Sequence, residues 1–145
     1  MKQYTLLFLT ILLLGVVAGC KKTEVDSDPK SLLVANSWKL NRITDVQGQT
    51  IANSRLGIET QAIFGLDIQF RENNVTRATD RVTKQIINGG TWFLTEDAKA
   101  IDIEISQFKG RFELVELSRG KLVLRNRVPV SGTQQDANME FVPSL

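Results

Sequence analysis

The sequence contains no histidine among its 145 residues and only one cysteine, Cys20. Without histidine, the chain lacks the usual general base of triad hydrolases and the commonest protein ligand of transition metals. A single cysteine cannot form a disulfide within the chain, so packing alone has to hold the fold together. These absences predict a protein that is not an enzyme, with no catalytic residue, no metal site and no cofactor.

An excess of one charge is also missing. The chain has 18 Lys and Arg against 16 Asp and Glu, which gives a formal net charge of +2. Proteins that bind nucleic acids usually carry a clear basic patch or stripe. The near balance of charge therefore predicts no nucleic-acid partner.

One long apolar run is present, from residue 6 to residue 19, with Thr10 as its only polar member. Lys2 precedes the run, and small residues end it. A membrane-spanning helix needs about 20 apolar residues, so this run is short for that purpose. A positive start, an apolar centre and a small-residue end are typical of a secretory signal peptide, here predicted over residues 1–19.

The end of this run, Val17-Ala18-Gly19-Cys20, resembles a bacterial lipobox. That resemblance implies cleavage before Cys20 and lipidation of Cys20, with palmitate as a typical acyl group, whereas a plain signal peptide with a chance cysteine is the alternative. Several acyl chains on one residue anchor a protein to a membrane effectively permanently. Residues 20–30 are polar and contain Pro29, so we expect a flexible tether there. Acidic residues after the cysteine resemble the surface-export signal of Bacteroidetes lipoproteins, which implies a lipid-anchored protein of the outer membrane on its periplasmic or cell-surface face.

From residue 37 onward, apolar residues alternate with polar ones, as in Ala100-Ile101-Asp102-Ile103-Glu104-Ile105. Strict alternation indicates strands with one buried face and one wet face. Turns are expected at Asn73-Asn74, Asn88-Gly89-Gly90, Glu96-Asp97, Lys109-Gly110 and Arg119-Gly120. The predicted strands cover residues 37–44, 64–71, 75–82, 91–95, 100–106, 111–117, 121–127 and 138–142.

Eight short antiparallel strands favour an all-β fold, an eight-stranded up-and-down barrel over residues 31–145, because closure removes exposed strand edges. A β-sandwich is the alternative. Residues 31–35 are expected to form a helical turn that plugs one end. Residues 45–63 are expected to be a loop near a rim, with a short helix within 54–62. A bulge near Leu114–Val115 is expected to bring Phe112, Leu114, Val115 and Leu117 to the core side.

Segments along the domain, NSWKL at 36–40, NGGTWFLTEDAKAIDIEI at 88–105, FELVELSRGKLVLR at 112–125 and MEFVPS at 139–144, resemble the lipocalin-like lipoproteins of Bacteroidetes. The resemblance implies a lipocalin-like barrel in which Trp38 opens the first strand and an arginine, Arg125 or Arg127, packs against it. Asn36 occupies the position of the glycine that precedes this tryptophan in lipocalins. Asparagine is the next best residue for a left-handed backbone, so this departure from the lipocalin pattern is mild.

The predicted functional feature is an apolar pocket inside the barrel. On the alternation, its candidates are the inward aromatic residues together with two polar rim residues: Trp38, Arg42, Phe70, Trp92, Phe112, Asn126 and Phe141, with Phe64 also inward. The carboxylates Asp102, Glu104, Glu113 and Glu116 are expected to face solvent rather than to form an acid–base pair. Two functions stay open, binding of a small hydrophobic or amphipathic ligand, and a filled barrel that serves as an accessory subunit of an outer-membrane protein assembly.

Overall fold

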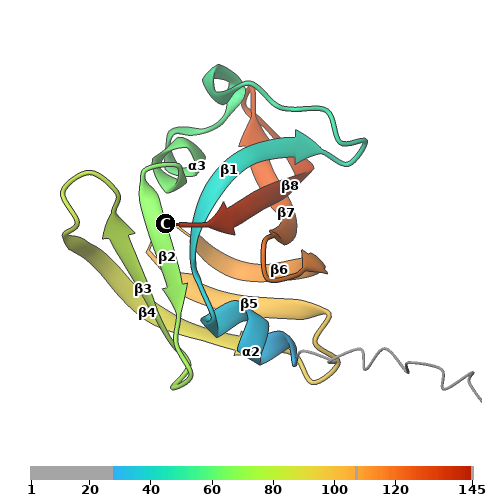
Figure 1. Ribbon diagram of the computed structural model, residues 1–145. Helices are drawn as coiled ribbons and strands as arrows, with labels where there is room; N and C mark the ends of the chain where they lie inside the picture. The colour runs from blue at the N-terminus through green and yellow to red at the C-terminus, as the bar shows by residue number, and fades with distance from the viewer. Residues whose placement is uncertain (1–27, 107, 145) are drawn as a thin grey trace, which may run out of the picture.

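The computed structural model describes residues 28–106 and 108–144, which form a β-barrel with two short α-helices (Figure 1). The lipidation site predicted at Cys20 lies outside the described residues. The elements in chain order are α2 (Pro29–Val34), β1 (Ser37–Asp45), the 3-10 helix η1 (Asn53–Arg55), α3 (Ile58–Ile63), β2 (Leu66–Phe70), β3 (Val75–Asp80), β4 (Ile86–Leu94), β5 (Ala100–Ile105), β6 (Phe108–Leu117), β7 (Leu122–Val130) and β8 (Thr133–Pro143).

The eight strands form a closed barrel in which each strand pairs antiparallel with its neighbours in sequence. The first and last strands complete the ring, with Leu40 opposite Phe141. Closure pairs the backbone of every strand on both sides, so no edge is left for pairing with another chain. The predicted all-β, up-and-down architecture is confirmed, and the sandwich alternative is wrong.

Helix α2 lies at one end of the barrel, called the closed end below (Figure 1). Asp28 caps the helix by accepting a hydrogen bond from the backbone N–H of Ser31, at 3.1 Å, and Pro29 occupies its first turn. Leu33 is completely buried, and its carbonyl accepts a hydrogen bond from Nε1 of Trp38 at 2.9 Å. The predicted plug therefore exists, and it begins two residues earlier than expected, at Pro29.

The long connection between β1 and β2 crosses the opposite end of the barrel. The helix expected within this segment is α3, which buries Thr60 and Ile63. Backbone contacts hold the segment against β7, because the N–H of Gly57 donates to the carbonyl of Pro129 at 3.0 Å and Leu56 forms a bridge with Val130. This end is called the mouth below.

Alternation predicted the inward face of most strands correctly. Ile101, Ile103 and Ile105 of β5 are all at most 3% exposed, as are Phe70 of β2 and Phe112 of β6. Phe64 differs from the prediction, since it follows α3 rather than lying in β2, and it is half-buried. β2 begins only at Leu66.

Two of the predicted turns are wrong because they lie inside strands. Residues 88–90 belong to β4, and residues 109–110 belong to β6. The β3–β4 hairpin turns instead at residues 81–85, which leaves Val82 at its tip with 90% exposure. β6 therefore starts earlier than predicted, and Phe108 is buried rather than part of a connection.

Bulges determine which side chains face inward, and the strand pairing shifts in three places, one of them between Ala78 and Thr79 of β3. The pairing of β6 with β7 shifts between Leu114 and Glu116, which confirms the predicted bulge. Leu114 and Leu117 pack against the core, but Val115 is the extra residue and stays 42% exposed, so its predicted burial is wrong. A second bulge, between Leu40 and Arg42 in β1, was not predicted.

One polar group in the core of β3 has no hydrogen-bond partner in the described part of the chain. The hydroxyl of Thr76 is fully buried and has no hydrogen-bond partner among the described residues. An unsatisfied buried hydroxyl costs about 1–3 kcal/mol. We therefore expect Thr76→Val to raise the free energy of unfolding by about 1 kcal/mol in urea denaturation. The matched substitution Thr91→Val, on the outer face of β4, should change that free energy by less than about 0.5 kcal/mol, and destabilisation by Thr76→Val would contradict the assignment.

Candidate functional site

Three predicted pocket residues lie together at the closed end, where they fill the barrel. Trp38, Phe70 and Trp92 are each at most 1% exposed. Nε1 of Trp92 donates to the carbonyl of Arg71 at 2.9 Å, and its ring meets the edge of Phe70 at a centroid distance of 5.5 Å. Lys30 of α2 lies over the same ring at 5.9 Å. With their polar groups satisfied and their rings in contact, these side chains act as core.

The middle of the barrel is filled in the same way. Phe141 is 1% exposed and meets Phe108 edge-on at 6.0 Å, and Phe108 lies against Phe112 at 4.5 Å. Leu122 and Leu124, on the neighbouring strand, are fully buried. Among the described residues, the predicted aromatic side chains therefore fill the interior rather than line one deep pocket.

A hollow remains at the mouth, between α3 and strands β6 to β8, with a volume of about 240 Å³. Its floor is made of buried core side chains, and its rim carries polar ones. The floor comprises Thr60, Ile63, Phe108, Phe112, Val128 and Met139, and the rim comprises Glu59, Lys109, Asn126, Arg127, Pro129 and Gln134. Of the predicted pocket residues, only Phe112 and Asn126 line this hollow.

Asn126 lies half-buried on the inward face of β7, as predicted. Its Oδ1 accepts a hydrogen bond from the backbone N–H of Arg127 at 2.7 Å. Its Nδ2 lies beside Gly110, 3.6 Å from the position that a Cβ on that glycine would take. Asn126 is thus a polar group at the boundary between the apolar floor and solvent.

Arg42 does not face the interior, and its predicted place at the pocket rim is wrong. The bulge after Leu40 turns Arg42 to the outer surface and brings Ile43 inward. Arg42 pairs there with Glu140 of β8 through two hydrogen bonds, of 2.9 and 3.2 Å. Nothing in the local alternation signals this bulge.

The arginine expected against Trp38 is also not found among the described residues. Arg125 donates from Nε to Oδ1 of Asn138 at 2.8 Å, and Arg127 is exposed at the mouth, far along β7 from the closed end. Asn36 is not in a left-handed conformation, and its side-chain amide instead donates to the carbonyl of Arg119 at 3.0 Å. This bond ties the start of β1 to the β6–β7 turn.

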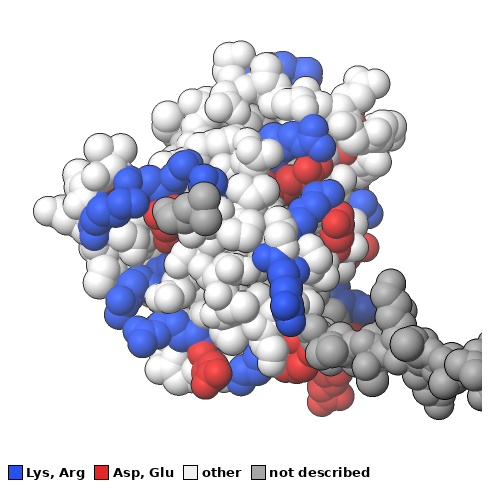
Figure 2. Space-filling view, in the orientation of Figure 1, with Lys and Arg blue, Asp and Glu red and all other residues white. Residues whose placement is uncertain are grey.

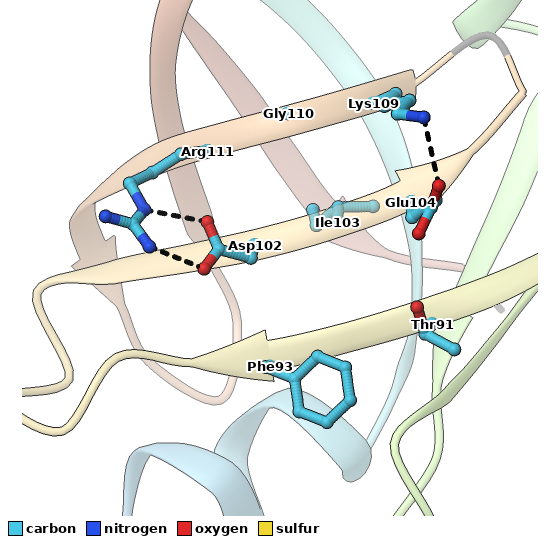
Figure 3. Close-up of a pocket in the computed structure, with 8 residues that line it drawn as sticks. All are labelled: Thr91, Phe93, Asp102, Ile103, Glu104, Lys109, Gly110 and Arg111. Carbon is cyan, nitrogen blue, oxygen red and sulfur yellow. Dashed lines mark hydrogen bonds and ion pairs between the residues drawn. The ribbon is translucent and has the colours of Figure 1, made fainter.

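A second hollow lies on the outer face of strands β4 to β6, with a volume of about 300 Å³ (Figure 3). Two rows of outward side chains border it, and each row follows the register of the strands. Phe93, Asp102 and Arg111 form one row, and Thr91, Glu104 and Lys109 form the other. Rows two residues apart on one face of a sheet are about 7 Å apart, and the backbone of Ile103 and Gly110 lies between them.

Both rows contain an ion pair. Arg111 binds Asp102 through two hydrogen bonds, of 2.7 and 2.8 Å, and Lys109 binds Glu104 at 2.9 Å. The hydrogen bond from Arg111 lowers the pKa of Asp102 below its ordinary value of 3.8. A lowered carboxylate pKa favours the folded state above the unfolded-state pKa, and this contribution is lost as the pH falls through the folded-state pKa. The Asp102 pair therefore persists at neutral pH.

The outward placement of Asp102, Glu104, Glu113 and Glu116 agrees with the prediction. The hollow on the outer face of β4 to β6 was not predicted. The position of Phe93 at its border, where the ring is 53% exposed, was not predicted either. One signal was available in the sequence. Asp102 and Glu104 before the β5–β6 turn, and Lys109 and Arg111 after it, have matched spacing and opposite charge, which is how cross-strand pairs arise in a hairpin.

Over residues 28–106 and 108–144, histidine, cysteine, aspartate and glutamate side chains form no group of three or more that is suited to hold a metal ion. In the same part of the chain, no helix has the length and apolar character needed to cross a membrane.

No protein-family model matches the sequence, and no curated protein matches it significantly. Among solved structures, the barrel is similar to a DUF4847 family protein from Bacteroides vulgatus ATCC 8482, with a TM-score of 0.51 and 10% sequence identity. The match covers 79% of this chain and 96% of that protein. At this identity the similarity concerns the fold alone, and it agrees with a lipocalin-like barrel.

Proposed function

We propose that the protein is a non-catalytic binding protein that holds a small amphipathic molecule in the hollow at the mouth of its barrel. The observation that carries the proposal is the composition of this hollow, in which buried core side chains such as Phe112 and Met139 form the floor beneath a polar rim. Ligand sites are typically concave and largely apolar, with a few polar groups that orient the ligand. Asn126 supplies such a group at the rim.

Size and charge define the class of ligand. A volume of about 240 Å³ is slightly below the usual range for drug-sized ligands, so the ligand is small. Among the charged side chains of the rim, Lys109 is already paired with Glu104, which leaves the cation Arg127 and the anion Glu59. A short apolar tail with a carboxylate head therefore fits better than a cationic amphiphile, because Arg127 is placed to meet the head group.

The fold also supports a tethered protein. Asp28 enters α2 at the closed end, whereas the hollow is at the mouth. We propose that Cys20 is lipidated after signal cleavage and anchors the chain to the outer membrane, as the lipobox-like sequence implies. A tether that leaves from the closed end keeps the mouth accessible from the side away from the membrane.

Binding of n-alkyl carboxylates from hexanoate to dodecanoate, measured by calorimetry on the chain with Cys20→Ser, tests the mouth. Each added methylene that is buried contributes about 0.8 kcal/mol, or about fourfold in affinity. We expect affinity to rise with chain length and then to level off once the tail fills the hollow. Native mass spectrometry of the protein from envelope extract should show a small amphipathic molecule bound to it.

The variant Asn126→Phe places a ring in the hollow and should abolish carboxylate binding. Asn41→Phe adds the same ring at an exposed position of β1 outside the hollow, and it should leave binding unchanged. Equal binding by the two variants, or no binding of any carboxylate in the series, would reject the mouth as a ligand site.

The anchor is tested separately by Cys20→Ser. Loss of the acyl chains should move the protein from the membrane fraction to the soluble fraction, since acyl chains supply the binding energy. Fractionation followed by immunoblotting measures this change, with Thr23→Ser as a control outside the lipobox. Retention of the Cys20→Ser variant in membranes would mean that another feature holds the chain there.

A second candidate function is supported by the filled barrel and by the β3–β4 hairpin. The hairpin exposes three apolar side chains near the mouth, Val82 at 90%, Ile86 at 60% and Ile87 at 52%. Exposed apolar clusters on soluble domains often mark protein–protein contacts. An accessory subunit of an outer-membrane protein assembly would use this hairpin as its contact surface. If one partner protein co-purifies with the parent chain but not with the Val82→Asp variant, this function is favoured over ligand binding.

A further inference from the structure

The hollow on the outer face of β4 to β6 continues beyond the region drawn in Figure 3. A neighbouring hollow of about 400 Å³ shares Thr91, Glu104 and Lys109 with it and extends along Gly89, Gly90 and Ser106. Together they form an open, elongated depression, called the outer groove below. Its shape suits a chain-like ligand rather than a compact one.

The charges in the outer groove are balanced. Its two cations, Arg111 and Lys109, are each bound to one carboxylate, and the face visible in Figure 2 likewise places acidic side chains beside basic ones. A charged ligand would have to break one of these pairs and leave its partner without a counterion. Electrostatic complementarity therefore favours a neutral ligand.

These pairs still leave hydrogen-bonding capacity. A guanidinium has five N–H donors and Arg111 uses only two toward Asp102, while the Lys109 ammonium uses one of its three toward Glu104. The carboxylates retain acceptor sites, and the hydroxyl of Thr91 can donate and accept. The groove thus presents donors and acceptors in alternation, an arrangement that hydroxyl groups satisfy because each of them does both.

One apolar surface completes the groove. The ring of Phe93 is 53% exposed and stands at the end of the row that contains Asp102 (Figure 3). The face of an aromatic ring carries negative charge density and attracts weakly positive C–H groups. A ligand with a C–H face and a hydroxyl edge satisfies both the ring and the polar rows.

The closed barrel argues against an extended peptide here. Peptides that bind sheets commonly add a strand at an open edge and gain backbone hydrogen bonds there. Strands β4, β5 and β6 are paired on both sides, so their outer face offers side chains only. We propose that the outer groove binds a neutral oligosaccharide, with one sugar ring stacked on Phe93 and neighbouring hydroxyl groups bound by Arg111, Asp102, Lys109 and Glu104.

The test titrates the ¹⁵N-labelled chain carrying Cys20→Ser with maltohexaose, cellohexaose and mannohexaose, and with a chondroitin sulfate hexasaccharide as the anionic comparison. At least one neutral hexasaccharide should shift the amide signals of residues 89–93, 102–104 and 109–111 at millimolar concentration. High salt should leave this binding unchanged, because no net charge is neutralised. Phe93→Ala should weaken it by about tenfold.

Two variants separate stacking from loss of structure. Phe93→Tyr keeps an aromatic face and should preserve binding. Val115→Ala removes an exposed apolar side chain of β6 that does not line the groove, so it should leave binding unchanged. The proposal fails if none of the neutral hexasaccharides shifts these signals, if Phe93→Ala binds as well as the parent, or if only the anionic hexasaccharide binds and salt weakens it. Lys109 borders both hollows, so carboxylate binding at the mouth is read from Asn126 and Arg127, and sugar binding from residues 89–93 and 102–104. Either site can then fail without the other.

Discussion

Replacement of Trp92 by alanine is expected to lower the free energy of unfolding by about 3–5 kcal/mol. The ring is 1% exposed, packs against Phe70 and donates a hydrogen bond to the carbonyl of Arg71. The substitution therefore opens a cavity and leaves that carbonyl without this donor. Globular domains are stable by only about 5–15 kcal/mol, and the loss is therefore large. Equilibrium unfolding in urea, followed by circular dichroism, measures it.

Phe93 is the matched control, because it is the next residue of β4 and points to the opposite face. Its truncation to alanine should change stability by less than about 0.5 kcal/mol, as for most surface substitutions. Trp92→Phe should fall between the two, since it keeps most of the packing and loses the hydrogen bond. Similar losses for Trp92→Ala and Phe93→Ala would contradict the separation of β4 into a dry face and a wet face.

Gly90→Ala is expected to be the most damaging single-methyl substitution in the barrel, with a loss of about 3 kcal/mol or more. A Cβ on Gly90 would collide with the carbonyl oxygen of Glu104 on β5 and lie 2.7 Å from its carbonyl carbon. Both are backbone atoms, so no side-chain rotation relieves the collision. The thermal midpoint should fall, and the variant is expected to accumulate poorly in its folded form.

Gly89→Ala is a stringent control for this prediction. The nearest atom to a Cβ on Gly89 is the carbonyl oxygen of Thr76 at 3.4 Å, which is ordinary van der Waals contact. We expect Gly89→Ala to change the free energy of unfolding by less than about 1 kcal/mol, because reduced freedom of the unfolded chain offsets the new contact. Equal effects at positions 89 and 90 would mean that β4 and β5 are not in close contact at Gly90.

The same glycines show why part of the fold was misread from the sequence. Asn88-Gly89-Gly90 has the composition of a turn, and local propensity alone predicts one. Gly90 serves a tertiary purpose instead, since β4 passes from its pairing with β3 to its pairing with β5 where a side chain at position 90 does not fit. This close approach between strands is invisible in a local window of sequence.

Alternation, by contrast, predicted the burial of Trp38, Trp92 and Ile103 correctly, because the period of two is a property of the strand itself. It failed for Arg42, where a bulge inserts one residue and reverses the faces that follow. Bulges depend on how two strands that are distant in sequence pair with each other, so the residues of one strand alone do not predict them.

The predicted pocket was affected by the same limitation. Strand periodicity indicates which side chains point inward, but it does not indicate whether they meet across the barrel. Trp38, Phe70, Trp92 and Phe141 are buried and fill the interior, whereas Phe112 and Asn126 lie where the mouth leaves space. The site was therefore predicted in part, and its location depended on packing between elements.

The ring of strands is completed by the pairing of β1 with β8, and the N–H of Ser144 donates to the carbonyl of Ser37 at 2.7 Å. During synthesis, the sheet therefore stays incomplete until the last strand has left the ribosome, and its contacts are among the most distant in sequence. A chain that stops before Thr133 would leave β1 and β7 with bare edges on which other copies can assemble. The C-terminal strand therefore protects the edges of β1 and β7 from self-association, and a chain without it should aggregate.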